Sequence, residues 1–470
     1  MGEASCAALG STAFLSSVLN LGMINTAAAR PHIIGSPNNY KAMVCILLAG
    51  GADTFNMLVP TESSEYADYE TTRGSLALPM SDLLDLDYDN AGRTFAVHGG
   101  MPDVRTMFDD GDLAFVSNVG TLIEPITDAA DYFNGNKQVP LGLYSHSDQI
   151  MQWQTSVPQS RSAVGVGGRM ADLLNDMNSI NGISMNISLD GRNRFQAGNQ
   201  VVEYAIDNST SAQNIGFNGF PSWWSDQGHL NAVKDSAISN MVEDTYSNIF
   251  HDTFGALSRQ NIESNAIFET ALANVNPLNT VFSPTALSQD LKKMAEVMSV
   301  RSHLGVERQI FFTTFGGWDH HDDVLNNQAV MLPILNNALK EFNAAMIELG
   351  LHDNVITFSI SDFARTLTSN GNGSDHAWGG NQIIMGGPVN GQTIYGNYPS
   401  LDLNGPLNLS DRGRILPTTS VDEFYADIAL WYGVSPNDLD YILPNLCNFY
   451  STSGCPVDPP ADYSPIGMFG

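Results

Sequence analysis

The sequence predicts an α/β fold, a three-layer sandwich in which helices cover both faces of a mostly parallel central sheet. Three observations carry this prediction. Apolar runs bounded by glycine, such as 41–49 (KAMVCILLA), are typical of strands buried on both faces. From about residue 285, such runs alternate with amphipathic helical patterns, which indicates parallel pairing of the strands. Several predicted strands also end in acids, imidazoles or hydroxyls, as expected at the carboxyl edge of such a sheet.

The predicted elements follow in order along the chain. After the strand at 41–49, a helix at 101–108 precedes a short strand at 113–118 (LAFVSN). A further helix covers 149–154 and follows the segment 144–148 (YSHSD), whose hydroxyls or acid can cap it. The C-terminal half then predicts helices at 285–303 and 325–349 and strands at 309–315 and 355–360.

The patterning predicts one main domain, residues 31–470, which carries a large insertion. Residues of about 160–285 are less regular and are rich in Asn, Ser, Gly and Gln, with helices expected near 168–177 and 230–258. At 470 residues the chain is long enough to bury a large core. We therefore expect a single elaborate domain with a helical and irregular insertion.

Residues 1–30 resemble an export signal. The stretch 4–21 is small and apolar, and Ala27, Ala28 and Ala29 offer an A-x-A-like cleavage site. No other stretch approaches the roughly 20 apolar residues that span a bilayer, so no integral membrane segment is expected in the mature chain. Cys447 and Cys455 flank a polar loop that a disulfide could close in an oxidising compartment, whereas Cys45 is expected to be a buried free thiol. These features predict a periplasmic or extracellular protein.

The charge balance excludes one class of partner. The chain has 50 acidic and 20 basic residues and a formal net charge of -30. This charge repels nucleic acid and anionic membranes, so neither is expected to bind. It is consistent with an acidic solvated surface that keeps the protein soluble, and it can raise the local concentration of divalent cations.

Two clusters predict a metal site. Residues 316–321 (GGWDHH) follow the apolar strand at 309–315, and residues 374–380 (SDHAWGG) repeat the same ingredients about 55 residues later. Because the carboxyl ends of parallel strands share one sheet edge, these clusters can converge with the polar residues that follow other strands. Those residues are Asp53, Ser145, His146, Asp362 and Arg365. One or two divalent metal ions are expected, zinc first, with magnesium, manganese and calcium as alternatives.

Each candidate has an alternative role. Asp319 and His321, two positions apart, can point to the same side as metal ligands, which leaves His320 pointing away. Asp322 or Asp323 can instead cap the helix that begins near Val324. The remaining candidates divide in the same way: Asp53 is a ligand or a turn residue, Asp362 a ligand or a helix cap, Arg365 an anion clamp or part of a surface ion pair, His376 a ligand, and Ser145 a nucleophile or a helix cap.

A family resemblance rests on motifs that occur in a fixed order. They are 48–56 (LAGGADTFN), 144–146 (YSH), 316–321, 361–366 (SDFART) and 374–380, followed by 385–387 (MGG) and 394–396 (IYG). From about residue 40 to 468 the chain resembles the domain-of-unknown-function 1501 family of exported bacterial proteins. That family is similar in fold to the alkaline phosphatase and sulfatase superfamily, so the resemblance implies an alkaline-phosphatase-like fold. It also implies twin-arginine export, although residues 1–30 contain no arginine pair.

The resemblance implies roles for individual residues. Asp53 and Asp362 would hold one metal ion together with Ser145, the candidate nucleophile, while Asp319, His321 and His376 would hold the other. Ser145, His146 and Arg365 are thus the candidate catalytic residues. The sequence departs from the superfamily pattern in that Phe363 follows Asp362, where phosphatases carry a histidine ligand. The segment 156–161 (SVPQSR) also misses the sulfatase pattern C/S-x-P-x-R by one residue.

Two functions of different classes follow. The first is a secreted metal-dependent hydrolase of phosphate esters, less favourably of sulfate esters, acting on a small-molecule or polymer substrate. The second is a non-catalytic secreted protein that binds metal and associates with the cell surface or with glycans. The set of Asp319, His321 and His376 favours the first function, and the missing histidine after Asp362 favours the second.

Overall fold

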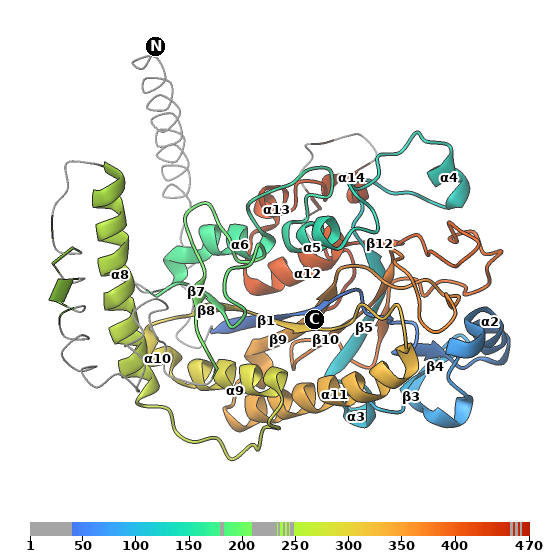
Figure 1. Ribbon diagram of the computed structural model, residues 1–470, viewed down its shortest axis with the longest axis horizontal. Helices are drawn as coiled ribbons and strands as arrows, with labels where there is room; N and C mark the ends of the chain where they lie inside the picture. Colours follow the sequence, from blue (N-terminus) through green and yellow to red (C-terminus); the bar gives the residue numbers. More distant parts are fainter. Residues whose placement is uncertain are drawn as a thin grey trace, which may run out of the picture. The chain divides into compact units, whose positions relative to one another are not determined.

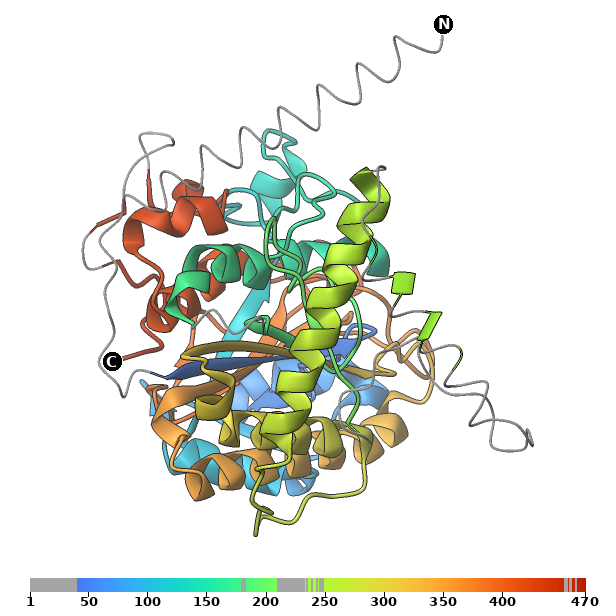
Figure 2. The ribbon, with the colours of Figure 1, turned by 90° about the vertical axis from the view of Figure 1, so that its left-hand side faces the viewer.

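A computed structural model describes residues 40–178, 183–208, 233, 236–237, 240–241, 244, 249–451, 455, 459–460 and 463–470. The predicted export segment, residues 1–30, lies outside the described residues, as does most of the first part of the helix predicted at 230–258. In the described part, that helix is α8 (Ile249–Leu272), which extends well beyond the predicted end (Figure 2).

A nine-stranded sheet forms the centre of the described chain (Figure 1). Strand β1 (Lys41–Ala49) lies between β8 (Arg308–Gly316) and β9 (Val355–Ser361) and pairs with both in parallel. The sheet order is β11-β5-β10-β9-β1-β8-β6-β7, with β12 paired to β5. Strand β10 is antiparallel to both of its neighbours, and the other named pairings are parallel. The remaining strands are β5 (Leu113–Gly120), β6 (Asn186–Ser188), β7 (Tyr204–Ala205), β10 (Gly380–Met385), β11 (Ile394–Tyr395) and β12 (Thr419–Ser420).

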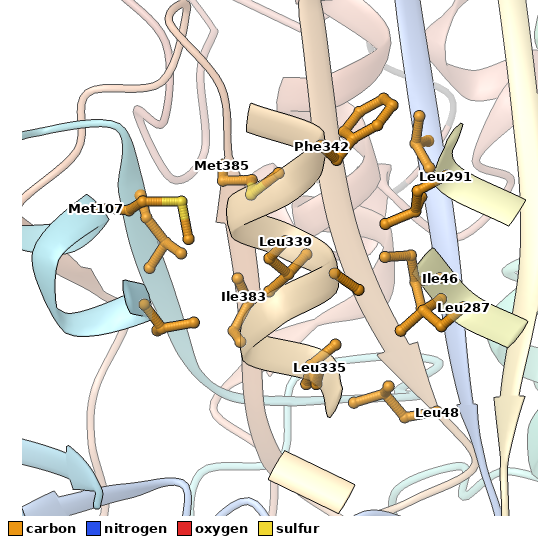
Figure 3. Packing of buried hydrophobic residues seen from close by; sticks show 14 of the residues in the cluster. Ile46, Leu48, Met107, Leu287, Leu291, Leu335, Leu339, Phe342, Ile383 and Met385 are labelled. Carbon is orange, nitrogen blue, oxygen red and sulfur yellow. The ribbon is translucent and has the colours of Figure 1, made fainter. Parts of the chain in front are cut away.

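Alternate residues of β1 face two helical layers, which confirms the predicted three-layer α/β class. Ile46 and Leu48 belong to one buried cluster, together with side chains of α3 (Pro102–Asp109), α9 (Ala286–Ser299) and α11 (Val324–Glu348) (Figure 3). Met43, Cys45 and Leu47 belong to the opposite cluster. That cluster includes α5 (His146–Thr155), α6 (Val166–Leu174), α12 (Val421–Tyr432) and α13 (Leu439–Ile442), which lie on the other side of the sheet in Figure 1. Successive side chains of β1 point to opposite faces of the sheet, so its continuous apolar run packs against both helical layers.

A small antiparallel sheet, which was not predicted, stands beside the central one. Its order is β2 (Leu58–Pro60), β4 (Arg93–His98) and β3 (Leu83–Asn90), and α2 (Ser63–Arg73) lies between β2 and β3 in the chain. Its strands are short or carry several acids, so their apolar pattern is weak. The last residue of α2, Arg73, is buried.

Three further features complete the fold. The helix predicted at 285–303 divides at Val300 into α9 and α10 (Arg301–Leu304). Strands β6 and β7 come from the predicted insertion but extend the central sheet. Two further short helices are α4 (Ala129–Phe133) and α14 (Cys447–Tyr450).

The structure contains both the disulfide and the buried free thiol that the sequence predicts. Cys447 and Cys455 form a disulfide, with their Cα atoms 5.7 Å apart, and Cys45 is a buried free thiol. Within the described residues, no helix is both long enough and apolar enough to span a bilayer.

The loops after β1 and β8 cross closely enough to require glycine at position 50. Gly50 has a φ of 118°, and a Cβ there would lie 2.4 Å from the backbone nitrogen of Asp319. The backbone nitrogen of Trp318 donates to the carbonyl of Ala49 at 3.1 Å. The crossing therefore fixes the backbone of Asp319 against the end of β1.

Replacing Gly50 by alanine should lower the free energy of unfolding by about 3 kcal/mol, because steric overlap adds to the strain of a positive φ. Gly92→Ala is the matched control, since Gly92 has a φ of 90° and a Cβ there would meet no atom within 4 Å. It should cost only about 1 kcal/mol. Urea denaturation measures both; equal losses would show that the loop crossing adds nothing.

Asp422, in the first turn of α12, is a buried carboxylate in the layer of α5, α6, α12 and α13. Burial raises the pKa of Asp422 to about 7, against the opposing effects of Ser156 and the positive charge of Arg169. Because its pKa is higher in the folded than in the unfolded chain, this group contributes stability below about pH 4, and that stability is lost as the pH rises toward 7.

Asp422→Asn should therefore flatten the pH dependence of stability between about pH 4 and 7. In the wild type, this one group makes the free energy of unfolding fall by up to about 1.4 kcal/mol per pH unit. Denaturant titrations at several pH values give the slopes, and the exposed Asp411→Asn serves as control. Identical slopes for wild type and Asp422→Asn would contradict the assignment.

Candidate metal centre

The predicted site residues lie at the carboxyl ends of the central strands. Asp362 directly follows β9, and Asp319 comes three residues after the end of β8. His146 is the first residue of α5. His376 is brought to them because its backbone forms an antiparallel bridge with that of Arg365. Residues from positions 146 to 376 thus meet at one edge of the sheet.

Three imidazoles converge on one carboxylate. Asp319 Oδ1 lies 3.1 Å from His321 Nε2 and 3.4 Å from His376 Nε2, and Asp319 Oδ2 lies 3.4 Å from His146 Nε2. The two atoms His321 Nε2 and His376 Nε2 are 2.9 Å apart. Ligands about 2.0–2.2 Å from a tetrahedral zinc ion lie about 3.3–3.6 Å from one another, so most of these separations are close to those of a zinc site.

The other ring nitrogen of each histidine has an acceptor. His376 Nδ1 lies 2.7 Å from the carbonyl oxygen of Tyr144, which can only accept, so Nδ1 carries the hydrogen. His321 Nδ1 lies 3.1 Å from Asp375 Oδ1, and His146 Nδ1 lies 2.7 Å from Asp362 Oδ2. When Nδ1 donates, the neutral imidazole presents a lone pair at Nε2.

The centre therefore needs a cation. The Nε2 atoms of His146, His321 and His376 lie 3.1–3.4 Å from the Asp319 carboxylate, and the lone pairs of His321 and His376, 2.9 Å apart, repel unless a proton or a metal ion lies between them. A ligand set of three imidazoles and one carboxylate suits Zn²⁺, and the acceptors at Nδ1 are those that usually orient metal-binding histidines. His146, Asp319 and His376 also form the one group of three potential ligands found among the described residues. The residues present fit a divalent metal ion.

The charges around the centre favour the ligand forms. Partial burial raises the pKa of Asp319, but the hydrogen bond and charge of Arg365 outweigh it and hold the pKa below its ordinary value. Burial lowers the pKa of His376, against the opposing hydrogen bond to the Tyr144 carbonyl. Asp375 is likewise partly buried, which raises its pKa, but hydrogen bonds from Asn370 and Arg412 lower it overall. Near neutral pH, Asp319 is thus ionised and His376 is neutral.

A segment that contains five of the predicted site residues matches a known family. Residues 281–439 match the family described as "Protein of unknown function (DUF1501)". The predicted resemblance is confirmed for this part of the chain. Asp319, His321, Asp362, Arg365 and His376 all lie in it, whereas Asp53, Ser145 and His146 precede it.

Three solved structures show distant similarity to this chain. Ps i-CgsB in complex with k-i-k-neocarrahexaose has 11% identity and a TM-score of 0.34, covering 86% of this chain and 74% of that chain. The PsFucS1 sulfatase from Pseudoalteromonas sp. has 9% identity and a TM-score of 0.31, covering 84% and 68%. The alkaline phosphatase from the Antarctic bacterium TAB5 has 11% identity and a TM-score of 0.25, covering 76% and 94%. No curated protein matches the sequence.

Arg365 is fully buried and binds the loops of the chain rather than a surface partner. Its Nε donates to the carbonyl of Gly51 at 2.7 Å, and its Nη1 donates to the carbonyl of Ser374 at 3.2 Å. Its Nη2 donates to the carbonyls of Gly50 and Trp318 and to Asp319 Oδ1. Because its nitrogens already donate to these acceptors, Arg365 positions Asp319. The geometry does not support its alternative role as an anion clamp.

Asp53 and Asp362, the two carboxylates predicted to hold a second metal ion, are already bound by other groups of the protein. Asp53 Oδ2 pairs with Arg73 Nη2 at 2.5 Å, and both side chains are buried. Asp362 accepts from the backbone nitrogen of Gly50 at 2.9 Å and contacts His146 at 2.7 Å. Asp362 therefore orients His146, while Asp53 is an ion-pair partner.

Among the described residues, the side chains of the remaining candidates make no hydrogen bond or ion pair with the cluster. Ser145 occupies the N-cap position of α5 without a side-chain capping bond, and its Oγ lies 3.2 Å from Ser147 Oγ. His320 is buried beside Trp318, in agreement with the prediction that it points away from the ligands. Asp323 occupies the N-cap position of α11, where its side chain accepts from Asn326 Nδ2 at 2.7 Å rather than from a backbone nitrogen of the helix.

Two parts of the centre were missed in the sequence. The candidate ligands did not include His146, which was considered only for catalysis, although its position before a helix after a polar loop resembles that of the other candidates. Asp375 was not singled out, although it precedes His376 and its carboxylate binds both His321 and Arg412. Neither contact follows from local spacing, because each joins residues more than 30 positions apart.

Asp375→Asn should weaken the binding of Zn²⁺ about 10- to 100-fold, because the carboxylate that orients His321 and makes its imidazole more basic is lost. The affinity is measured by competition with a chelating dye. Asp322→Asn, which changes the carboxylate next to His321 that does not contact its ring, is the matched control. Equal affinities for Asp375→Asn and the wild type would contradict the orienting role.

Proposed function

We propose that this protein is an exported metal-dependent hydrolase that acts on a phosphate ester. The observation that carries the proposal is that three imidazole Nε2 atoms lie within 3.4 Å of the solvent-exposed carboxylate of Asp319. The side chains of Asp319 and His321 are 46% and 45% exposed, so a substrate can reach the centre. The disulfide between Cys447 and Cys455 supports an oxidising, extracytoplasmic location.

The chain's own residues hold and orient the centre. His146, Asp319, His321 and His376 would hold the cation, Arg365 fixes Asp319, and the acceptors at Nδ1 fix the three rings. When bound, a divalent cation supplies Lewis-acid chemistry, polarising a phosphoryl oxygen and making water more acidic. Zinc suits this ligand set best, with manganese, magnesium and calcium as alternatives.

The geometry supports water, rather than Ser145, as the source of the attacking oxygen. The Ser145 hydroxyl contacts Ser147, and within the described part of the chain no contact joins it to Asp319 or to the three histidines. Phosphate is favoured over sulfate because the stretch that most nearly fits the sulfatase pattern begins at Ser156. That residue is buried at the C-terminal end of α5 and is not among the cluster's contacts.

A second candidate function is a non-catalytic secreted protein that binds metal and associates with the cell surface or with glycans. One observation favours it: the charges of two arginines near the site are paired with aspartates. Arg365 pairs with Asp319 and Arg412 with Asp375. These two guanidinium charges are therefore not available to an anionic ester.

The proposed hydrolysis makes Asp319 essential and Ser145 dispensable. With p-nitrophenyl esters of phosphate and sulfate, assayed with each of the four metals, Asp319→Asn should reduce the rate at least about 100-fold, because a ligand is lost. Ser145→Ala should retain wild-type activity, as should the control Ser147→Ala. A large loss in Ser145→Ala alone would identify a serine nucleophile, and a wild type that binds metal but hydrolyses no ester would favour the non-catalytic function.

A further inference from the structure

We propose that the guanidinium of Arg73 takes the place of a second metal ion, so that the chain binds one divalent cation rather than two. This inference rests on the proposed metal-dependent function and concerns how many cations the site can hold. In this proposal, Arg73 supplies a permanent positive charge within the fold. It is the last residue of α2, a helix that was not predicted.

The first support is the enclosed pair of Arg73 and Asp53. Arg73 Nη2 lies 2.5 Å from Asp53 Oδ2, and both side chains have 0% exposure. Arg73 Nη1 also donates to the carbonyls of Thr366 and Leu367, at 3.4 and 3.3 Å. A metal ion that used Asp53 would have to displace a guanidinium fixed on several sides and enter a site without solvent access.

The rest of the Asp53 environment is closed as well. The backbone carbonyl of Asp53 accepts from Gln328 Nε2 at 2.8 Å. Asp53 Oδ1 has no hydrogen-bond partner among the described residues, but it is shielded from solvent. Burial lowers the pKa of Arg73, but the charge and hydrogen bond of Asp53 outweigh it and raise that pKa overall, so the guanidinium remains charged. The negative charge of Asp53 is thus balanced without a metal ion.

The second support is that both side-chain oxygens of Asp362 already have partners within the protein. Its Oδ1 accepts from the backbone nitrogen of Gly50, its Oδ2 contacts His146 Nδ1, and its side chain is fully buried. The next residue, Phe363, places its ring 4.8 Å from the ring of His146 and 4.5 Å from that of His376, measured between centroids. An apolar ring therefore packs against the ligands, and each carboxylate of the predicted second site already binds a donor, with only Asp53 Oδ1 left without a partner among the described residues.

The positive charge of Arg73 is not a substitute for a metal ion in contact with substrate. Because the guanidinium is enclosed, it neutralises Asp53 and ties α2 to the segment after Arg365, but it does not reach the solvent-exposed side of Asp319. Arg73 is accordingly a positioning residue, and its effect is measured best on metal binding.

The test counts the metal ions bound by the full chain. The protein is stripped with a chelator, loaded separately with excess Zn²⁺ and Mn²⁺, desalted, and analysed by mass spectrometry of the metals; calorimetric titration gives the number of sites independently. We expect one ion per chain. Two ions per chain would overturn the inference while leaving the proposed function intact, and zero would overturn both.

Variants assign the bound ion to the centre. Asp53→Asn keeps the shape of the residue and should retain one ion with unchanged affinity, although its melting temperature should fall because Arg73 loses its charged partner. Asp319→Asn should retain none. If Asp53→Asn does not fold, the pair Arg73→Met with Asp53→Leu removes both charges together and should also retain one ion. Loss of the ion in a folded Asp53 variant would overturn the inference.

Discussion

The site depends on one buried cation of the protein itself, the guanidinium of Arg365. Its donors reach the carbonyls that follow β1, the Trp318 carbonyl after β8 and the Ser374 carbonyl before His376. Each of these segments also delivers a residue of the centre or contacts one. A planar guanidinium with five donors in fixed directions can join several loops at defined angles, which a lysine cannot do. A single side chain therefore fixes the segments that carry Asp319 and His376 relative to each other.

The histidine tautomers are fixed in the same way, by acceptors supplied from outside the cluster. Tyr144 has a φ of 72°, an uncommon conformation for a residue other than glycine, and its carbonyl accepts from His376. Strain of this kind persists only where its surroundings enforce it, and it is often found at functional sites. The carboxylates of Asp362 and Asp375 serve the other two rings. The lone pairs are thus aimed before any cation is bound.

Much of the fold and part of the centre followed from local sequence patterns. The strands β1, β8 and β9 were predicted nearly to the residue because buried parallel strands are continuous apolar runs. Asp319, His321 and His376 stood out because acids and imidazoles gather after such strands. The part played by Arg73 could not be predicted, because its partner lies 20 residues earlier, beyond β2, and nothing in the pattern of α2 marks its last residue as buried. Long-range pairing of charges leaves no periodic signal.

The buried pair of Arg73 and Asp53 is weak evidence for stability, since removing two charges from water is costly and apolar residues of similar size often serve as well. Its position indicates another role. It closes the side of the site next to Asp53, while Asp319 and His321 remain open to solvent. Asp53 and Asp319 each follow a buried strand and therefore look alike in the sequence. They differ in solvent access, which a cation needs in order to bind. Solvent access and the donors already present, rather than the number of acids, decide where a metal ion can bind.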